Sequence, residues 1–148
     1  DPMFAWVEPN ESKRRSGLPG FFRLIIRYCL RYGEVYSAKD DKGVALWLTP
    51  GNTSMTIGRI IKSGMWKTPF YFKIPGIFRF MILDTFSEKL HKRIAPAHHW
   101  YLLLLGVDPD SQGKGIGMEL VQPILKQCDR DGLSCYLETN KFDNLHFY

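Results

Sequence analysis

The chain has 148 residues, of which 45% are hydrophobic and 14% aromatic, so it can bury the core of one domain without disulfides or metals. Its formal net charge of +5 permits an anionic partner, but the basic residues are scattered, which argues against a dedicated nucleic-acid interface. The three cysteines, Cys29, Cys128 and Cys135, form no CxxC pattern, which gives little support to a zinc site or a disulfide framework. We therefore expect one cytoplasmic domain with no metal, no nucleic-acid partner and no membrane association.

The first third of the chain predicts a helix followed by a hairpin. Apolar residues recur at helical spacing over 18–32, and Gly33 is well placed to end that helix. Residues 34–38 and 44–48 are predicted to form two short strands. Because the connection between them is rich in turn-forming residues, an antiparallel hairpin is expected.

The middle of the chain, residues 54–96, combines aromatic and basic residues. It predicts two helices, broken near Pro69 and again at Pro75 and Gly76. These helices are expected to pack on the sheet, and part of the segment could also form the wall or lid of a substrate pocket.

The last third predicts a strand, a glycine-rich loop, a helix and another strand. Residues 100–107 form a continuous apolar run suited to a central strand, and a turn follows over 108–111. Residues 133–139 are expected to form the last strand. The helix between these strands is predicted to end at Gly132 and to bend at Pro123. Its expected apolar face consists of Ile116, Leu120, Val121, Ile124, Leu125 and Cys128.

The glycine loop predicts a phosphate-binding site. Gly113, Gly115 and Gly117 precede a helix, whose first turn offers free backbone N–H groups and a partial positive charge, and Lys114 could add charge there. The loop does not fit a Walker pattern, which needs Ser or Thr at position 115, nor a dinucleotide pattern, which needs glycine where Met118 stands. From the glycines alone, a structural turn that binds no ligand is an equally good interpretation.

The sequence Gln112-Gly113-Lys114-Gly115-Ile116-Gly117, preceded by Leu105-Gly106-Val107-Asp108-Pro109, closely resembles the acyl-CoA-binding motif of the GNAT acetyltransferases. In that motif Gln or Arg is followed by two residues, a Gly, one residue, and Gly or Ala. Residues 136–140 and 144–148 also resemble the strand and helix that follow it in the family. The resemblance is specific over 98–148 and compatible over 18–97.

This resemblance implies an α/β (α+β) fold of the GNAT type. Its mixed, mostly antiparallel sheet is flanked by helices and contains a splayed pair of parallel central strands. Residues 1–148 then form a single GNAT-like acyltransferase domain. Since the family pattern continues beyond Tyr148, we expect the C-terminal strands to be missing and the N-terminus to be incomplete as well. An exposed sheet edge could pair with a second copy of the chain to form a homodimer.

The resemblance also implies the chemistry: an N-acetyltransferase that moves an acetyl group from acetyl-CoA to a primary amine of a small molecule or peptide by direct attack. Tyr148 matches the tyrosine that protonates the departing thiolate. For the general base, Glu138 is the first candidate and His99 or His98 the second. The implied cofactor-binding residues are Leu105, Gly106, Val107, Gln112, Gly113, Lys114, Gly115, Ile116, Gly117 and Asn144. The alternative is a catalytically silent CoA-binding or protein-interaction module.

Overall fold

The computed structural model describes residues 2–148, which divide into two compact units. The helical unit comprises residues 2–28, 56–94 and 138–148. The sheet unit comprises residues 29–55 and 95–137. Each unit has its own set of internal contacts.

The helical unit contains α1 (Pro2–Val7), most of α2 (Glu11–Tyr32), α3 (Ile57–Ser63), the 3₁₀ segment η2 (Met65–Phe70), α4 (Ile74–Ile94) and α6 (Asn144–Phe147). Its core includes Phe21, whose ring lies 5.2 Å from that of Phe72 and 5.5 Å from that of Phe80, both edge to face. Such pairs contribute about 0.5–1.5 kcal/mol each beyond the apolar area they bury. These contacts connect α2 to α4 and to the segment before it.

Two of the sequence expectations for these helices are corrected by the structure. Helix α2 begins at Glu11 and runs through Pro19, so it starts well before the predicted residue 18. The predicted break at Pro75 and Gly76 is wrong, because both residues lie in the first turn of α4. Proline is tolerated there, since the N–H it lacks would have no partner within the helix.

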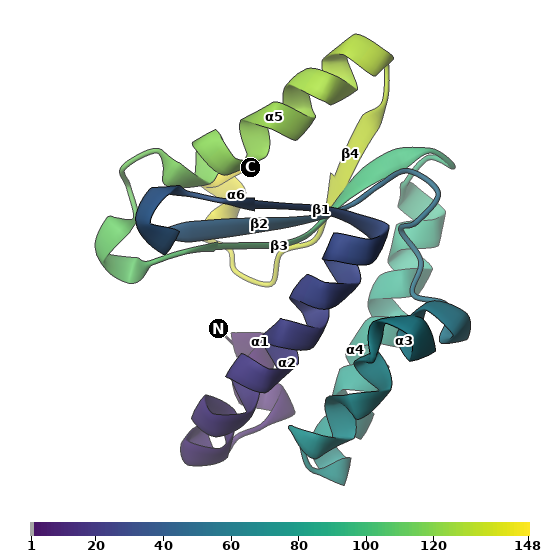
Figure 1. Cartoon of the computed structure of the whole chain (residues 1–148), viewed down its shortest axis with the longest axis vertical. Helices are drawn as coiled ribbons and strands as arrows, with labels where there is room; N and C mark the ends of the chain where they lie inside the picture. Colours follow the sequence, from purple (N-terminus) through teal and green to yellow (C-terminus); the bar gives the residue numbers. More distant parts are fainter. Residues whose placement is uncertain (1) are drawn as a thin grey trace. The chain divides into compact units, whose positions relative to one another are not determined.

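The sheet unit contains four strands and one long helix. The strands are β1 (Gly33–Ser37), β2 (Gly43–Leu48), β3 (His99–Val107) and β4 (Ser134–Leu137), and they lie in the order β1-β2-β3-β4. The first two pairings are antiparallel and β3 pairs with β4 in parallel, which confirms the predicted mixed sheet. Helix α5 (Ile116–Asp131) joins β3 to β4 and lies along one face of the sheet (Figure 1).

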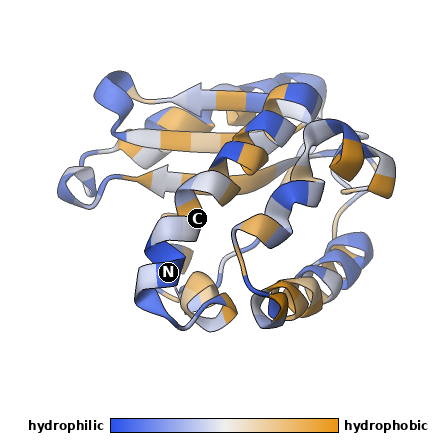
Figure 2. Cartoon of the chain, turned by 60° about the horizontal axis from the view of Figure 1, so that its bottom comes forward, coloured by the Kyte–Doolittle hydropathy of each residue, from blue (hydrophilic) through white to orange (hydrophobic). Residues whose placement is uncertain are grey.

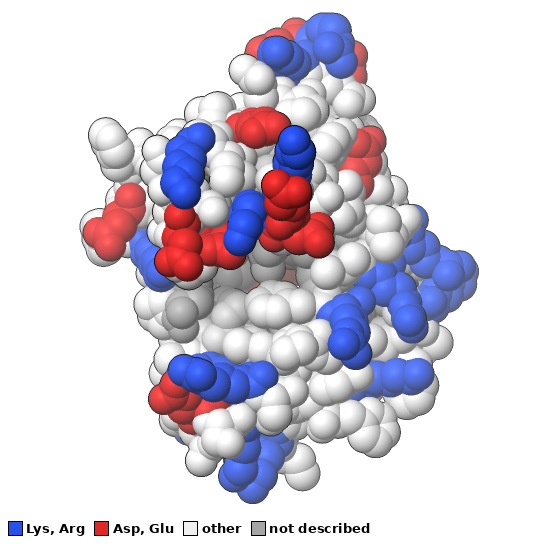
Figure 3. All heavy atoms as spheres, turned by 60° about the vertical axis from the view of Figure 1, so that its left-hand side comes forward, with Lys and Arg blue, Asp and Glu red and all other residues white. Residues whose placement is uncertain are grey.

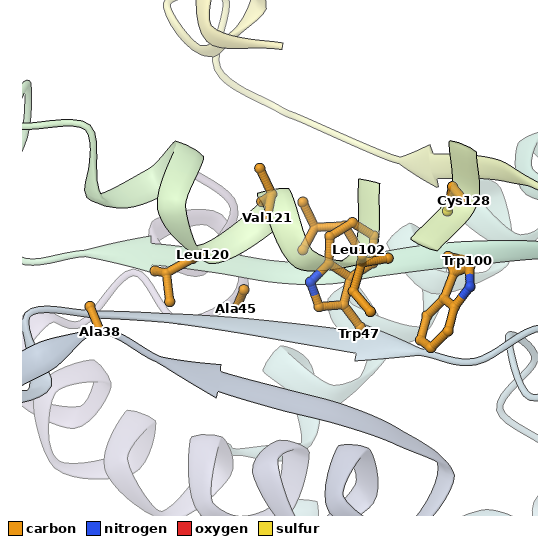
Figure 4. Close-up of a cluster of buried hydrophobic side chains, with 9 residues drawn as sticks. Ala38, Ala45, Trp47, Trp100, Leu102, Leu120, Val121 and Cys128 are labelled. Atoms are coloured by element: carbon orange, nitrogen blue, oxygen red, sulfur yellow. The ribbon is translucent and has the colours of Figure 1, made fainter. Parts of the chain in front are cut away.

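The core of the sheet unit lies between α5 and that face. Trp47 from β2 and Trp100 from β3 meet edge to face at 6.5 Å, and Ile124 of α5 is fully buried against the same cluster. Figure 4 shows the cluster, which consists of Ala38, Ala45, Trp47, Trp100, Leu102, Leu120, Val121, Ile124 and Cys128. Leu125 was expected on the same helix face but is 37% exposed.

The hairpin of β1 and β2 is held tightly at one end and turns sharply at the other. A side chain at Gly33 would place its Cβ 1.8 Å from the carbonyl oxygen of Trp47, so only glycine fits there. At the other end a short 3₁₀ turn, η1 (Lys39–Asp41), reverses the chain, with Asp40 and Asp41 at positive φ. Figure 2 shows hydrophobic colours along the strands and hydrophilic ones at their turns.

Candidate cofactor site

Strand β3 is longer than its parallel neighbour, and this leaves part of one edge open. The pairing with β4 extends only from His99 to Leu102, opposite Ser134 to Leu137. Strand β3 continues to Val107, and on its other side it remains paired with β2 to that point. Residues 103–107 therefore have no strand on the β4 side within the described part of the chain. This is the splayed pair that the resemblance implied.

A β-bulge at Leu103 marks the start of this open edge. Trp47 of β2 pairs with Leu102 and the adjacent Leu46 pairs with Leu104, so Leu103 is an extra residue in β3. The side chains that pack toward α5 show the same shift, because they are spaced by two from Trp100 to Leu102 and then by three to Leu105. A bulge re-aims backbone groups and locally disrupts pairing. Here it directly follows Leu102, the last residue that pairs with β4.

The open edge leads to the glycine loop, in which two glycines adopt conformations that other residues rarely take. Gly113 has φ of 74° and Gly115 has φ of 81°, both in the left-handed region. A Cβ atom built at either position would meet no atom within 4 Å. The backbone therefore requires glycine there, and the space beside it is free to admit a ligand.

Helix α5 begins directly after Gly115. The N–H of Glu119 bonds to the carbonyl of Gly115 at 3.0 Å, and this is the first hydrogen bond of the helix. The N–H groups of the first turn, from Ile116 onward, have no acceptor within the helix itself. Free N–H groups at a helix start, together with the helix dipole, favour an anion such as a phosphate.

The side chains of the loop hold its shape. The Gln112 side chain donates to the carbonyl of Val107 at 3.2 Å and so connects the loop to the end of β3. The ammonium of Lys114 donates to the carbonyl of Asp110 at 2.8 Å. These two residues therefore act first as supports of the loop in the structure.

Asp108 holds the start of the loop. Its carboxylate accepts the N–H of Asp110 at 2.9 Å and pairs with Lys42 at 3.3 Å. The hydrogen bond from Asp110, and then Lys42, lower the pKa of this carboxyl. Acidic and basic side chains lie beside one another over part of the face shown in Figure 3. An anionic ligand here would therefore depend on the backbone donors more than on a basic surface.

Most of the predicted cofactor residues come together in the sheet unit. Residues 105–107 lie on the open edge of β3, and residues 112–117 form the loop and the first turn of α5. The strand edge and the loop follow each other without a break. They would suit an elongated ligand with amide groups along its length and a phosphate group at one end.

His99 lies at the other end of β3, eight residues from Val107, or about 26 Å at the rise of a strand. It is only 4% exposed, and its Nδ1 atom lies 2.6 Å from the carbonyl oxygen of Pro96. Its ring also meets that of Tyr136 at 6.0 Å. These contacts favour a packing role, and its assignment as a second candidate base stays a prediction.

The other predicted residues belong to the helical unit. Strand β4 ends at Leu137 and not at residue 139 as predicted, so Glu138 follows the strand and is exposed. Asn144 begins α6, and its side-chain amide donates to the hydroxyl of Thr139 at 3.2 Å. Tyr148 follows α6, and burial raises the pKa of its phenol. The roles of these three residues rest on the motif match.

The bulge at Leu103 is the feature of the site that sequence reasoning missed. It falls inside a run of four leucines, 102–105, and such a run gives no alternation from which the extra residue could be located. The interval of three between the inward-facing Leu102 and Leu105 is visible only in the structure.

The sheet unit thus combines a mixed α/β fold with an open strand edge and a glycine loop at a helix start. Residues 76–148 match the model of the Acetyltransferase (GNAT) family. An uncharacterized N-acetyltransferase of Schizosaccharomyces pombe is 32% identical over 156 aligned residues, which include 100% of this chain. Both matches support membership of the GNAT superfamily, and the chain spans 62% of the length of that relative.

Two other kinds of feature are absent from residues 2–148. Among residues 2–148 no group of three or more His, Cys, Asp or Glu side chains is arranged to hold a metal ion. Within that range, too, no helix combines the length and the hydropathy that crossing a membrane requires. The glycine loop and the strand edge thus remain the best-supported site.

Proposed function

We propose that this chain binds acetyl-CoA along the open edge of β3 and on the glycine loop, and that it transfers the acetyl group to a primary amine. The observation that carries the proposal is the continuity of the two features. Residues 103–107 of β3, which have no strand on the β4 side, lead into a loop at the start of α5, where the first-turn N–H groups and the open space at Gly113 and Gly115 suit a pyrophosphate.

Each part of the cofactor has a proposed partner in the sheet unit. The backbone of residues 104–107 pairs with the amide groups of the pantetheine arm, as an added strand would. The N–H groups of residues 113–117 bind the pyrophosphate, and the side chain of Gln112 keeps the loop attached to Val107. The bulge at Leu103 turns backbone donors toward the thioester carbonyl, where a hydrogen bond would stabilise the developing oxyanion.

The transfer itself needs a neutral amine and a proton for the departing thiolate. We propose that Glu138 accepts the proton of the amine and that Tyr148 protonates the sulfur. A well-placed acid or base contributes about a hundredfold to ten-thousandfold to the rate. A phenol whose pKa is raised stays protonated at neutral pH and can therefore donate. Asn144 is proposed to bind the cofactor arm, and the cytoplasm is the proposed compartment.

The binding step is tested by calorimetric titration of the chain with acetyl-CoA, beside a Gly115→Glu variant. The glutamate places bulk and negative charge where the pyrophosphate should lie, so we expect binding to weaken by at least about tenfold. Gly132→Glu is the matched control, because Gly132 also has positive φ and open space but lies at the far end of α5. Equal binding by the parent and both variants would refute the site.

The chemical step is tested by incubating the chain with acetyl-CoA and a panel of primary amines, with acetylated products detected by mass spectrometry. Tyr148→Phe and Glu138→Gln should each lower the turnover rate by about a hundredfold or more while leaving acetyl-CoA binding within a few-fold of the parent. Binding without turnover on any amine would favour the silent CoA-binding module, whereas turnover unaffected by both variants would refute the proposed roles of Tyr148 and Glu138.

A further inference from the structure

Two cysteines that are separate in the sequence pattern meet in the sheet unit. The Sγ atoms of Cys128 and Cys135 lie 3.2 Å apart. Cys128 is 5% exposed, whereas Cys135 is an exposed residue. The third thiol, Cys29, is fully buried and is not part of this pair. The sequence had given little support to a disulfide, because the three cysteines form no CxxC pattern.

The fold brings the pair together through the turn between α5 and β4. Cys128 is on the inward face of α5, one turn after Ile124, and its carbonyl accepts the N–H groups of Gly132 and Leu133. Gly132, at φ of 65°, ends the helix and reverses the chain. Cys135 then falls on the same face of β4 as Leu137, which packs against the core under α5.

We propose that Cys128 and Cys135 are an oxidation site, at which hydrogen peroxide or a related peroxide converts the two thiols into an intramolecular disulfide joining α5 to β4. Disulfide bonds have an S–S length of about 2.0 Å, so closure requires a movement of little more than 1 Å from the observed separation. Strand β4 has few other backbone constraints at this point, since it pairs with β3 over only four residues.

The reaction proceeds in two balanced steps. The thiolate of the exposed Cys135 attacks a peroxide oxygen, the O–O bond breaks, and Cys135 becomes a sulfenic acid while one water leaves after protonation. The thiol of Cys128 then attacks the sulfur of Cys135, so that the S–S bond forms, the S–O bond breaks and a second water leaves. In total two thiols and one hydrogen peroxide give one disulfide and two waters.

The environment of Cys135 sets the conditions for the experiment. Burial, the neighbouring thiol of Cys128 and the charge of Asp129 raise the pKa of Cys135 to about 12. Because the thiolate is the reactive form, oxidation is slow at neutral pH and accelerates about tenfold for each unit that the pH rises toward that pKa. In the experiment the chain is therefore treated with hydrogen peroxide at pH 8.5 to 9 for several hours.

The test uses the full chain, treated with hydrogen peroxide and then digested with trypsin without reduction. Cleavage after Lys126, Arg130 and Lys141 should give peptides 127–130 and 131–141 joined by one bond. The intact mass should fall by about 2 Da, and two of the three thiols should be lost together and return on reduction.

Matched single substitutions distinguish a disulfide between Cys128 and Cys135 from nonspecific oxidation. Cys135→Ser should abolish the joined peptides, whereas Cys29→Ser should leave them unchanged, with circular dichroism confirming that both variants are folded. Joined peptides that persist in Cys135→Ser, or a parent in which Cys135 advances to the sulfinic acid while Cys128 stays reduced, would overturn the proposal. Disulfides found only between separate chains would overturn it as well.

Discussion

At the scale of single residues, Tyr36 gives a testable dependence on pH. Its hydroxyl donates to a carboxylate oxygen of Glu34 at 2.5 Å, and this bond, followed by burial, raises the pKa of Tyr36 to about 12. A folded pKa above the unfolded value of about 10 means that the contribution to stability is present below pH 10 and is lost as the pH rises toward 12. We expect Tyr36→Phe to lose stability less steeply than the parent between pH 10 and 12 in denaturant titrations.

The Glu34→Gln variant serves as the control for this effect. Without the carboxylate, the pKa of Tyr36 should move back toward its ordinary value, and the change is measurable as tyrosinate absorbance at 295 nm. If the titration of Tyr36 were the same in the parent and in Glu34→Gln, the hydrogen bond would not be its cause.

The core of the sheet unit offers a second residue-scale prediction. Ile124 is fully buried between α5 and the sheet, so Ile124→Ala removes packing and leaves a cavity. We expect a loss of about 2–5 kcal/mol in the free energy of unfolding, measured by denaturant titration. The neighbouring Leu125 is 37% exposed, and Leu125→Ala should cost markedly less. Equal costs at the two positions would show that this helix face is not the core.

At the scale of elements, deletion of the bulge in β3 should weaken acetyl-CoA binding without disrupting the fold. Deleting Leu103 would bring Leu102 and Leu104 into a regular ladder opposite Trp47 and Leu46 without turning any side chain to the other face. The deletion variant should therefore keep its secondary structure. It should bind acetyl-CoA at least about tenfold more weakly, because the backbone donors at the bulge are lost.

Leu103→Ala is the matched variant for that deletion. It shortens the side chain but retains the extra backbone residue, so calorimetry should find acetyl-CoA binding close to that of the parent. Weak binding by Leu103→Ala and normal binding by the deletion variant would contradict the proposed role of the bulge.

The elements also show how far sequence reasoning reaches. The hairpin of β1 and β2, the long strand β3 and the helix α5 were predicted, because alternation, apolar periodicity and the glycine at position 132 are local signals. The predicted break at Pro75 was wrong, since a proline ends one helix or begins another according to what precedes it. The end of β4 at Leu137 depends on where β3 stops pairing with it. That pairing is a tertiary contact, which local sequence signals do not encode.

The candidate site divides in the same way. The glycine loop was predicted from position and residue type, and the positive φ of Gly113 and Gly115 explains why glycine stands there. The bulge at Leu103 was not predicted, because its neighbours are also leucines. The supporting hydrogen bond from Gln112 to Val107 requires the loop to fold back on its own strand, which no spacing rule encodes.

At the scale of the whole molecule, the net charge of +5 makes a prediction about partners. Binding of acetyl-CoA through backbone donors at one helix start should weaken by less than about tenfold between 50 and 200 mM salt. Binding of a nucleic acid through several phosphate contacts would weaken by about a thousandfold or more over the same range. Calorimetry with acetyl-CoA and fluorescence anisotropy with a labelled oligonucleotide measure the two. Tight oligonucleotide binding at 200 mM salt would contradict the expected absence of a nucleic-acid partner.

The connections within the sheet have a consequence for the order in which the chain folds. Strands β1 and β2 are joined by the five residues 38–42, whereas β2 and β3 are neighbours in the sheet yet are separated in the chain by the fifty residues 49–98. Loop closure becomes more costly with length, and a tenfold longer connection adds about 2 kcal/mol of entropy. The β1–β2 hairpin should therefore form early. Strand β3, which carries the proposed cofactor edge, joins the hairpin only after the long helical segment has been brought back, so the proposed site is among the last parts of the chain to be completed.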